Sequence, residues 1–123
     1  MRATSPTVQS WKHDDGVSIF DCVNIDHLRA RWLDLMRREL PEAAGRRPDW
    51  PIRLDHCFGR VILDAVHGRP WREAVPAPAY RHMDAAALRT AIALAEAILA
   101  GDADLHALNR ESLRMRARRA VAP

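Results

Sequence analysis

The sequence predicts an all-α fold, an irregular four-helix bundle with an extended N-terminal arm and a long loop between its second and third helices. Apolar residues recur at spacings of three and four in four stretches, which segments containing Pro and Gly separate. The set of strands that an α/β fold needs is missing. A chain of 123 residues, of which 48% are hydrophobic, suits one domain with a modest core. We expect an arm over residues 1–23 and one helical domain over residues 24–119.

The composition argues against several classes of protein. The net charge of +3 is a mild positive excess and does not require a polyanionic partner. Lys12 is the only lysine, so all the other basic residues of the Lys and Arg count are arginines. No apolar run reaches the roughly 18 residues of a membrane-spanning helix, and residues 1–12 lack the apolar centre of a signal peptide. Cys22 and Cys57 do not form a disulfide framework. We therefore expect a cytoplasmic protein with free thiols and no membrane partner.

The first half of the chain predicts an arm followed by one helix. Residues 1–16 are polar and mixed, which is typical of a loose arm. Residues 17–23 are apolar and β-branched but have no second strand to pair with, so we expect them to lie extended on the helices. Asn24 is a candidate N-cap, and Pro41 is expected to close the helix that follows it.

Local signals define the remaining elements. Residues 41–51 contain three prolines and a glycine and are expected to form a loop; Pro51 then suits the first turn of a second helix, which stops at Gly68. The third helix is capped by Asp84 and ended by Gly101, and Asp102 or Asp104 caps the last one. The connection over residues 68–83 is longer than usual and carries aromatic side chains, so we expect it to be ordered.

The second helix carries the residue types of a functional site. Its apolar face holds Leu54, Phe58, Val61, Ile62, Ala65 and Val66, and its polar stripe holds Arg53, His56, Cys57, Arg60, Asp64 and His67. A face that only meets solvent would more often carry Lys, Glu and Gln. Gly59 lies within this helix at a cost of about 0.5–1 kcal/mol relative to Ala, which indicates close approach of a neighbour or a ligand.

Three residues of this stripe predict a catalytic set. Cys57 lies near several cations that favour the thiolate, the reactive form of cysteine, so it is the candidate nucleophile or acceptor thiol. His56 is the candidate proton carrier and Asp64 the candidate group that orients an imidazole. The alternative interpretation is that Cys57 is a half-buried structural cysteine.

Asp55 is predicted to project into the apolar face, where an unpaired charge is costly. It is interpreted either as a carboxylate that fixes the site or acts as a general base, or as a cap-like group in the first turn. His56 and His67 are too far apart along the helix to share one metal ion, and the spacing matches no zinc motif, so we expect no metal.

Candidate ligand-binding residues come from the second helix and from the loop after it. Arg53 and Arg60 form a candidate anion-binding pair, with Trp71, Tyr80 and Arg81 as the opposite wall. Alternatively, the two arginines are surface residues paired with acidic neighbours. The sequence indicates no particular cofactor.

These observations favour a protein that binds a small-molecule or nucleobase-like ligand on the helix 53–67, under the loop 68–83. A Cys/His-based enzyme, or an alkyl or acyl acceptor, is included in this hypothesis. A nucleic-acid-binding module is the first alternative, with arginines on phosphates and Trp71 or Tyr80 stacked on bases. A helical interaction protein or homodimer is the second.

Part of the chain also resembles a family of small uncharacterised microbial helical proteins. The similarity lies in Asp55-His56-Cys57-Phe58-x-Arg60-Val61-x-x-Asp64, Gly68-Arg69-Pro70-Trp71, Pro78-Ala79-Tyr80-Arg81 and Leu108-Asn109-Arg110-x-Ser112-Leu113, within about residues 50–116. It implies that the helix with Cys57 and the loop from Trp71 to Tyr80 form one unit. Some members carry the label of GNAT-type N-acetyltransferases, but the sheet and the pyrophosphate loop of that superfamily are missing here, so no acetyl-CoA-binding residue is assigned.

Overall fold

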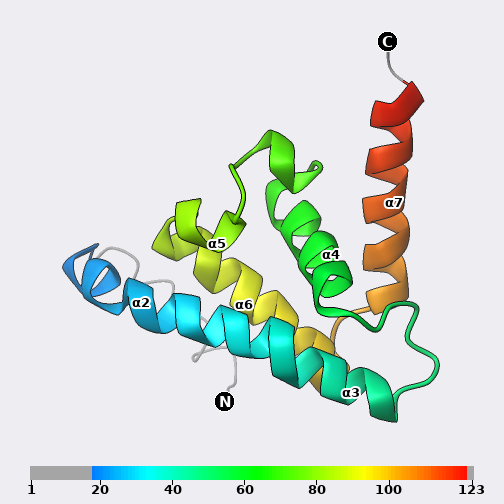
Figure 1. Cartoon of the computed structure of the whole chain (residues 1–123), viewed down its shortest axis with the longest axis horizontal. Coiled ribbons are helices and arrows are strands. Elements are labelled where there is room, and N and C mark those ends of the chain that lie inside the picture. Colours follow the sequence, from blue (N-terminus) through cyan, green and yellow to red (C-terminus); the bar gives the residue numbers. More distant parts are fainter. Residues whose placement is uncertain (1–17, 122–123) are drawn as a thin grey trace, which may run out of the picture.

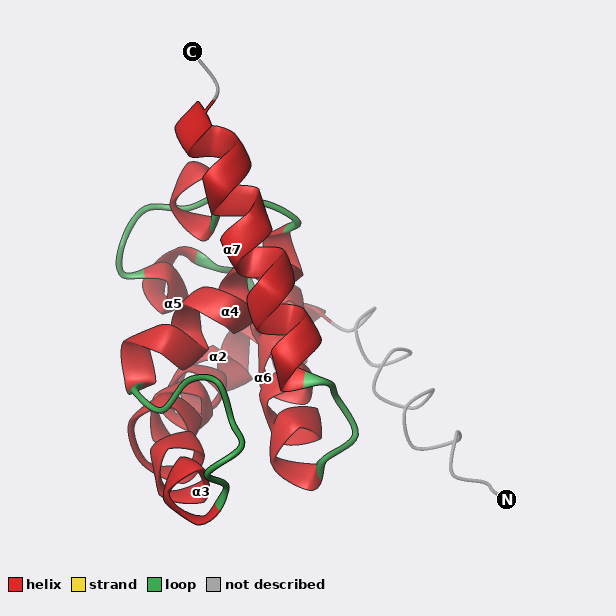
Figure 2. Ribbon diagram, turned by 90° about the vertical axis from the view of Figure 1, so that its right-hand side faces the viewer, coloured by secondary structure: helices red, strands yellow, loops and turns green. Residues whose placement is uncertain are grey.

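The protein is helical throughout the part that the computed structural model describes, residues 18–121, with side chains described over residues 25–118 (Figure 2). Within that range there is no strand, so the predicted all-α class is confirmed. None of the described helices is long and apolar enough to cross a bilayer. The elements in chain order are α2 (Ser18–Asp34), the π-helix η1 (Leu35–Glu39), α3 (Leu40–Arg46), α4 (Asp55–His67), the 3₁₀ helix η2 (Trp71–Glu73), α5 (Ala79–His82), α6 (Ala85–Ala100) and α7 (Leu105–Val121).

The start of the first helix differs from the prediction. Residues 18–23 form the first turns of α2, so the extended conformation expected for them is wrong, and Asn24 lies inside the helix instead of capping it. With no strand to pair with, the backbone groups of this segment find partners by continuing the helix, and that need outweighs the weak β preference of its side chains. The rest of the predicted arm, residues 1–17, lies outside the described residues.

Pro41 does not end the helix as predicted, because the chain stays helical from Ser18 to Arg46. The last turn before Pro41 is a wide one: η1 is a π-helix, in which the backbone N–H of Leu40 donates to the carbonyl oxygen of Leu35. A proline has no N–H and its ring crowds the carbonyl four residues before it. Such π turns occur where the regular hydrogen bonds of an α-helix are interrupted. Pro41 lies in the first turn of α3, a position that tolerates a residue without a backbone N–H. The loop is therefore 47–54, not 41–51.

The starts of α6 and α7 and the ends of α4 and α6 agree with their local signals, whereas α4 begins at Asp55 and not near Pro51 as predicted. The Asp84 side chain accepts a hydrogen bond from the backbone N–H of Ala87 at 2.8 Å, and Asp104 accepts one from Ala107 at 3.0 Å. Gly68 and Gly101 close α4 and α6 with φ of 71° and 82°, the left-handed region that favours glycine. These caps were all predicted, because each depends on residues only three or four positions apart.

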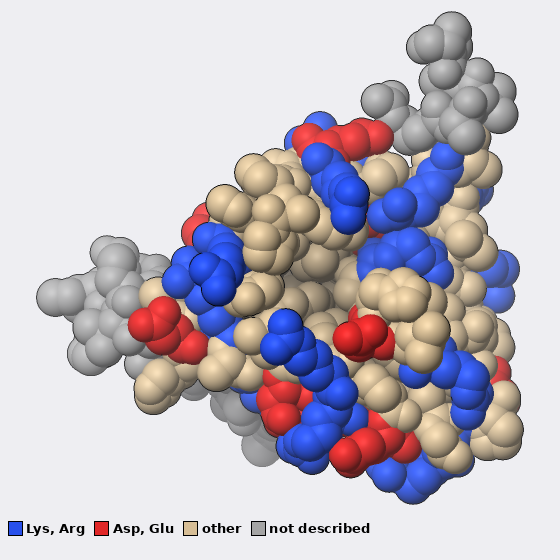
Figure 3. Space-filling view, viewed as in Figure 1, with Lys and Arg blue, Asp and Glu red and all other residues tan. Residues whose placement is uncertain are grey.

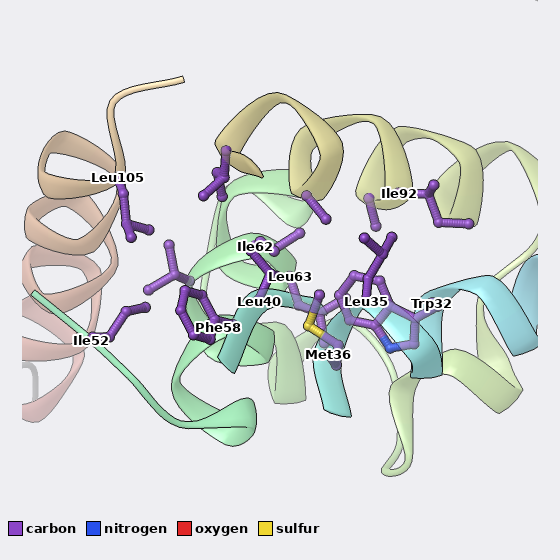
Figure 4. Packing of buried hydrophobic residues seen from close by; sticks show 14 of the residues in the cluster. Trp32, Leu35, Met36, Leu40, Ile52, Phe58, Ile62, Leu63, Ile92 and Leu105 are labelled. Carbon is purple, nitrogen blue, oxygen red and sulfur yellow. The ribbon is translucent and has the colours of Figure 1, made fainter. Parts of the chain in front are cut away.

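The core lies where α2, α4 and α6 meet. In Figure 1, α2 and α6 run side by side, while α4 and α7 stand together across them. Figure 4 shows the packing at this junction, where side chains of α2, η1 and α3 meet those of α4 and α6. The residues of the predicted apolar face of α4 are buried at Phe58, Val61 and Ile62, whereas Leu54 lies beyond the packed elements and is 57% exposed. The largest fully buried apolar side chains are Phe58, Leu35, Leu40, Ile62, Leu88, Ile98 and Val61.

A buried carboxylate joins α4 to α7. Asp64 is 0% exposed, and Arg116 donates to it with both arms of its guanidinium, Nε at 2.9 Å and Nη2 at 3.0 Å. The hydroxyl of Ser112 donates to the same carboxylate at 2.6 Å, and the backbone N–H of Trp71 donates at 2.9 Å. Because each oxygen of Asp64 accepts two hydrogen bonds, the charge is compensated even though it is buried. Asp64 therefore fixes α7 and η2 on α4.

This finding changes the role expected for Asp64. The prediction placed it on an open polar stripe, ready to orient an imidazole. In the structure, α7 covers that part of α4, and the recorded partners of Asp64 are Arg116, Ser112 and Trp71. A helical pattern alone identifies the stripe but not the element that packs on it.

Replacing Asp64 with Ala is expected to lower the free energy of unfolding by about 2–4 kcal/mol, since it strands the buried donors of Ser112 and Trp71 and removes the partner of Arg116. Urea denaturation measures the loss. Glu111→Ala, which removes the surface partner of Arg114, is the matched control and should cost less than about 1 kcal/mol. Equal losses in the two variants would contradict the assignment.

Candidate functional site

A cleft of about 200 Å³ opens on one face of the molecule, between α4, α2 and the segment that ends in α5. Figure 3 shows this face, with a hollow near its centre and Lys and Arg side chains on several sides of the hollow. Residues from three separate parts of the sequence line the cleft: Trp32 and Met36; His56, Gly59, Arg60 and Leu63; Trp71, Pro78, Ala79 and Tyr80.

The inner surface of the cleft is apolar, and its sides are aromatic. Trp32, Met36 and Leu63 belong to the buried core and reach the cleft from below. Trp71 and Tyr80 are half-buried and come from the segment 68–83, which is ordered as expected and contains η2 and α5. The backbone N–H of Trp71 is held by Asp64, so the position of this wall depends on the buried carboxylate.

Arg60 is the cationic group of the cleft, and α7 holds it in place. Its Nη1 donates to the Ser112 hydroxyl at 2.8 Å and its Nη2 to the Asn109 side-chain oxygen at 2.9 Å. Both partners are neutral, and Ser112 in turn donates to Asp64. The guanidinium is thus fixed without a direct ion pair to any acidic side chain recorded in the described range.

The residues of α7 that make this arrangement were not predicted from the sequence as site residues. Asn109, Ser112 and Arg116 follow one another at spacings of three and four, so they share a face of α7. That spacing was the available signal, since a polar row at helical period on one helix can match a polar stripe on another. The row is hard to recognise in the sequence because many other arginines lie near the C-terminus.

Tyr80 lies in a cationic environment. Arg81 Nε donates to the Tyr80 phenolic oxygen at 3.4 Å, and its guanidinium lies 5.7 Å from the ring centroid. The hydrogen bond from Arg81 lowers the pKa of Tyr80 below its usual value, and the charges of Arg81, Arg37 and Arg29 act in the same direction. Arg29 also donates to the backbone carbonyl oxygen of Tyr80 at 3.3 Å. This side of the cleft is therefore electropositive.

Gly59 leaves one position on the surface of α4 without a side chain. A Cβ atom added at Gly59 would meet no other atom within 4 Å, so no neighbouring element of the protein requires a glycine here. Its backbone is helical and not left-handed, so conformation does not require one either. Of the two explanations predicted for this glycine, close approach of a neighbour is excluded.

Asp55 does not project into the apolar face as predicted. Its side chain is 56% exposed, and its Oδ1 accepts a hydrogen bond from the backbone N–H of His56 at 2.7 Å. Because α4 begins at Asp55, later than the expected Pro51, this position lies in the first turn and beyond the packed elements. The cap-like alternative fits this geometry, in which a carboxylate meets free N–H groups at a helix start.

The other predicted residues do not gather at the cleft. Cys57 packs against the hydrophobic core and is not among the lining residues. His56 lines the cleft but is 75% exposed, whereas Asp64 is buried, so the predicted set of Cys57, His56 and Asp64 is not brought together. Arg53 donates to the backbone carbonyl oxygen of Ala44 at the end of α3, away from Arg60. Among the described residues, no group of three or more His, Cys, Asp or Glu is placed to hold a metal ion.

Comparison with known proteins gives no relative. No family model matches the chain, and no curated protein and no solved structure matches it. The resemblance stated above therefore stays a prediction, and the function has to be argued from the geometry of the cleft.

Tyr80 is the only tyrosine of the chain, so its titration can be followed directly by the absorbance of tyrosinate. We expect Tyr80 to ionise at lower pH in the folded protein than in the urea-unfolded chain. Arg81→Gln should raise its pKa toward the unfolded value, because the hydrogen bond and the nearby positive charge are both lost.

Arg72→Gln is the control for this titration, since Arg72 lies over the ring of Trp71 and is not among the groups that act on Tyr80. It should leave the titration unchanged. If Tyr80 titrates at the same pH in the Arg81→Gln variant as in the wild-type protein, the assigned contact is wrong.

Proposed function

We propose that this protein binds a small organic ligand in the cleft between α2, α4 and α5. The observation that carries the proposal is Gly59. A glycine inside a helix costs about 0.5–1 kcal/mol relative to alanine, and neither backbone conformation nor packing accounts for one here. The space above Gly59 is the cleft itself, so a side chain at this position would occupy it. A bound ligand is the remaining explanation predicted for the glycine.

The lining of the cleft supports this proposal. Ligand sites are mostly apolar concave surfaces with a few fixed polar groups, and this cleft combines an apolar floor with Arg60, His56 and the Tyr80 phenol. Arg60 is held by α7 before any ligand binds, which limits the entropy lost on binding. Four of the lining residues, His56, Arg60, Trp71 and Tyr80, are ones for which the sequence predicted a functional role.

The proposal is one of binding, with no covalent step at Cys57. The thiol packs against the core outside the cleft lining, so it is not placed to attack a ligand held above Gly59. His56 is the titratable side chain of α4 that lines the cleft and remains the candidate proton carrier of any reaction there.

Nucleic-acid binding is less well supported than binding of a small ligand. Two arginines of the C-terminal helix, on which this alternative depends, are already paired with acidic side chains: Arg114 contacts Glu111, and Arg116 contacts Asp64 through both arms. These pairs leave fewer cations for phosphates. A salt-dependent affinity for single-stranded DNA would be the result that favours this alternative.

A fragment titration tests the proposal. Phenol, benzamide, benzoate and uracil are added to isotopically labelled protein, and the backbone amide shifts of α4 are followed by NMR. We expect at least one compound to bind with shifts centred on Gly59. Gly59→Leu should abolish this binding while the melting temperature stays equal or rises, because the substitution fills the cleft and removes a helix-interior glycine.

Gly45→Leu is the matched control. Gly45 also has no atom within 4 Å of an added Cβ, but it lies in the last turn of α3 and is not among the residues that line the cleft. This variant should stay folded and bind normally. Binding that survives Gly59→Leu, or an absence of binding by every compound to the wild-type protein, would overturn the proposal.

A further inference from the structure

We infer that the ligand of this cleft is a planar single-ring carboxylate, with its carboxylate on Arg60 and its ring against Trp71 and Tyr80, and that Asn109 positions Arg60 for it. The inference rests on the proposed function and specifies the chemical class of the ligand. It follows from the balance of charge around Arg60, the size of the cleft and the aromatic character of its walls.

The charges at the contact of α4 with α7 do not cancel. Two guanidinium groups, Arg60 and Arg116, share a network with one buried carboxylate, Asp64. Arg116 takes that carboxylate with both arms, and Arg60 reaches it only through the hydroxyl of Ser112. One positive charge is therefore left over, and it belongs to the residue that lines the cleft. A carboxylate in the cleft would complete the pair.

Further cationic groups lie near the cleft. Arg81 contacts the Tyr80 phenol, and Arg37 and Arg29 act electrostatically on it. Of the acidic groups on α4, Asp55 is exposed and engaged with the backbone of His56, and Asp64 is buried and bound by Arg116, Ser112 and Trp71. Because the cleft is concave and lined largely by apolar side chains, these charges attract an anion more strongly than they would on a flat surface.

The volume of the cleft matches a ligand portion of about one ring. A cavity of about 150 Å³ is large enough to bind benzene. The cleft, at about 200 Å³, has room for one six-membered ring with a small substituent. Trp32, Trp71 and Tyr80 supply the flat apolar surfaces that a ring prefers. An aliphatic anion would fill the same volume without that match.

Asn109 is a positioning residue in this scheme. Its side-chain oxygen accepts a hydrogen bond from Arg60 Nη2, which fixes one edge of the guanidinium on α7. Because a guanidinium has five N–H donors, others remain for a ligand. Arg60 is its recorded side-chain partner, so its replacement disturbs Arg60 without touching the buried Asp64. Ser112 contacts both groups and is therefore a less selective site for mutation.

The first part of the test compares benzoate with benzamide, which has the same ring and nearly the same shape but no charge. Calorimetric or NMR titration should give an affinity for benzoate at least about tenfold higher, because a carboxylate forms charge-assisted hydrogen bonds with Arg60. Cyclohexanecarboxylate should bind more weakly than benzoate, and inorganic phosphate should not compete. Equal binding of benzoate and benzamide would show that Arg60 does not select a carboxylate. Competition by phosphate would show that the site selects charge and not an aromatic ring. Either result would overturn the inference.

The second part of the test uses Asn109. Asn109→Ala should weaken benzoate about three- to tenfold and leave benzamide unchanged, and Asn109→Asp should weaken benzoate further, since it supplies Arg60 with a competing carboxylate. Leu113→Ala, an exposed neutral change on α7, is the control and should alter neither. A parallel loss of benzoate and benzamide in the Asn109 variants would show a merely structural role and overturn the assignment.

These outcomes separate the two proposals. If benzamide binds as tightly as benzoate and Gly59→Leu abolishes both, the cleft is a ligand site but its ligand is not a carboxylate. If Gly59→Leu has no effect on any compound, the proposed function fails, and the inference fails with it.

Discussion

The carboxylate of Asp64 is the constraint on which the rest of the structure depends. It is fully buried, so every one of its hydrogen bonds must come from the protein, and the donors belong to two elements, α7 and η2, which it joins to α4. Ser112 and Arg116 fix α7, and the backbone of Trp71 fixes the segment that follows α4. Arg60 is also held by α7, and Trp71 lines the cleft. The positions of both sides of the candidate site therefore depend on Asp64.

A buried ion pair adds little net stability, because desolvation of the charges offsets most of their attraction. Its effect here is on arrangement. Arg116 is 37% exposed, so it can bring its charge to Asp64 while part of its side chain stays in water. Arg60 cannot use the same carboxylate directly and is bound by an amide and a hydroxyl instead. The cleft thus faces a fixed guanidinium that makes no ion pair with an acidic side chain among the described residues.

The sequence was sufficient wherever structure is decided locally, and it failed where distant elements decide. The cap at Asp84 and the glycines at helix ends depend on a few neighbouring residues and were predicted correctly, and Asp104 was one of the two candidates for the last cap. Pro41 was misjudged because a wide turn before it keeps the helix going. Likewise, periodicity predicted a buried Asp55 and an exposed Asp64. Asp55 is exposed because α4 begins there, and Asp64 is buried because α7 packs on it. The cleft shows the same division: its aromatic and cationic residues stand out in the sequence, but Trp32 and Met36, which form its floor, have the spacing of ordinary core residues.

Gly59 shows how a local cost points to a function. Most positions of this chain satisfy local propensity and tertiary packing together, which is what a stable, unique fold requires. Gly59 satisfies neither, because alanine would suit the helix better and would clash with nothing. Stability alone therefore favours a side chain at this position, and the side chain would be placed in the one cleft of the described face that is lined by both aromatic rings and a fixed guanidinium. A position that costs stability and preserves an open, charged, aromatic space is best explained by what enters that space. Among the described residues Arg60 has no carboxylate partner, and a carboxylate on the ligand would fit both the geometry and the charge of the cleft.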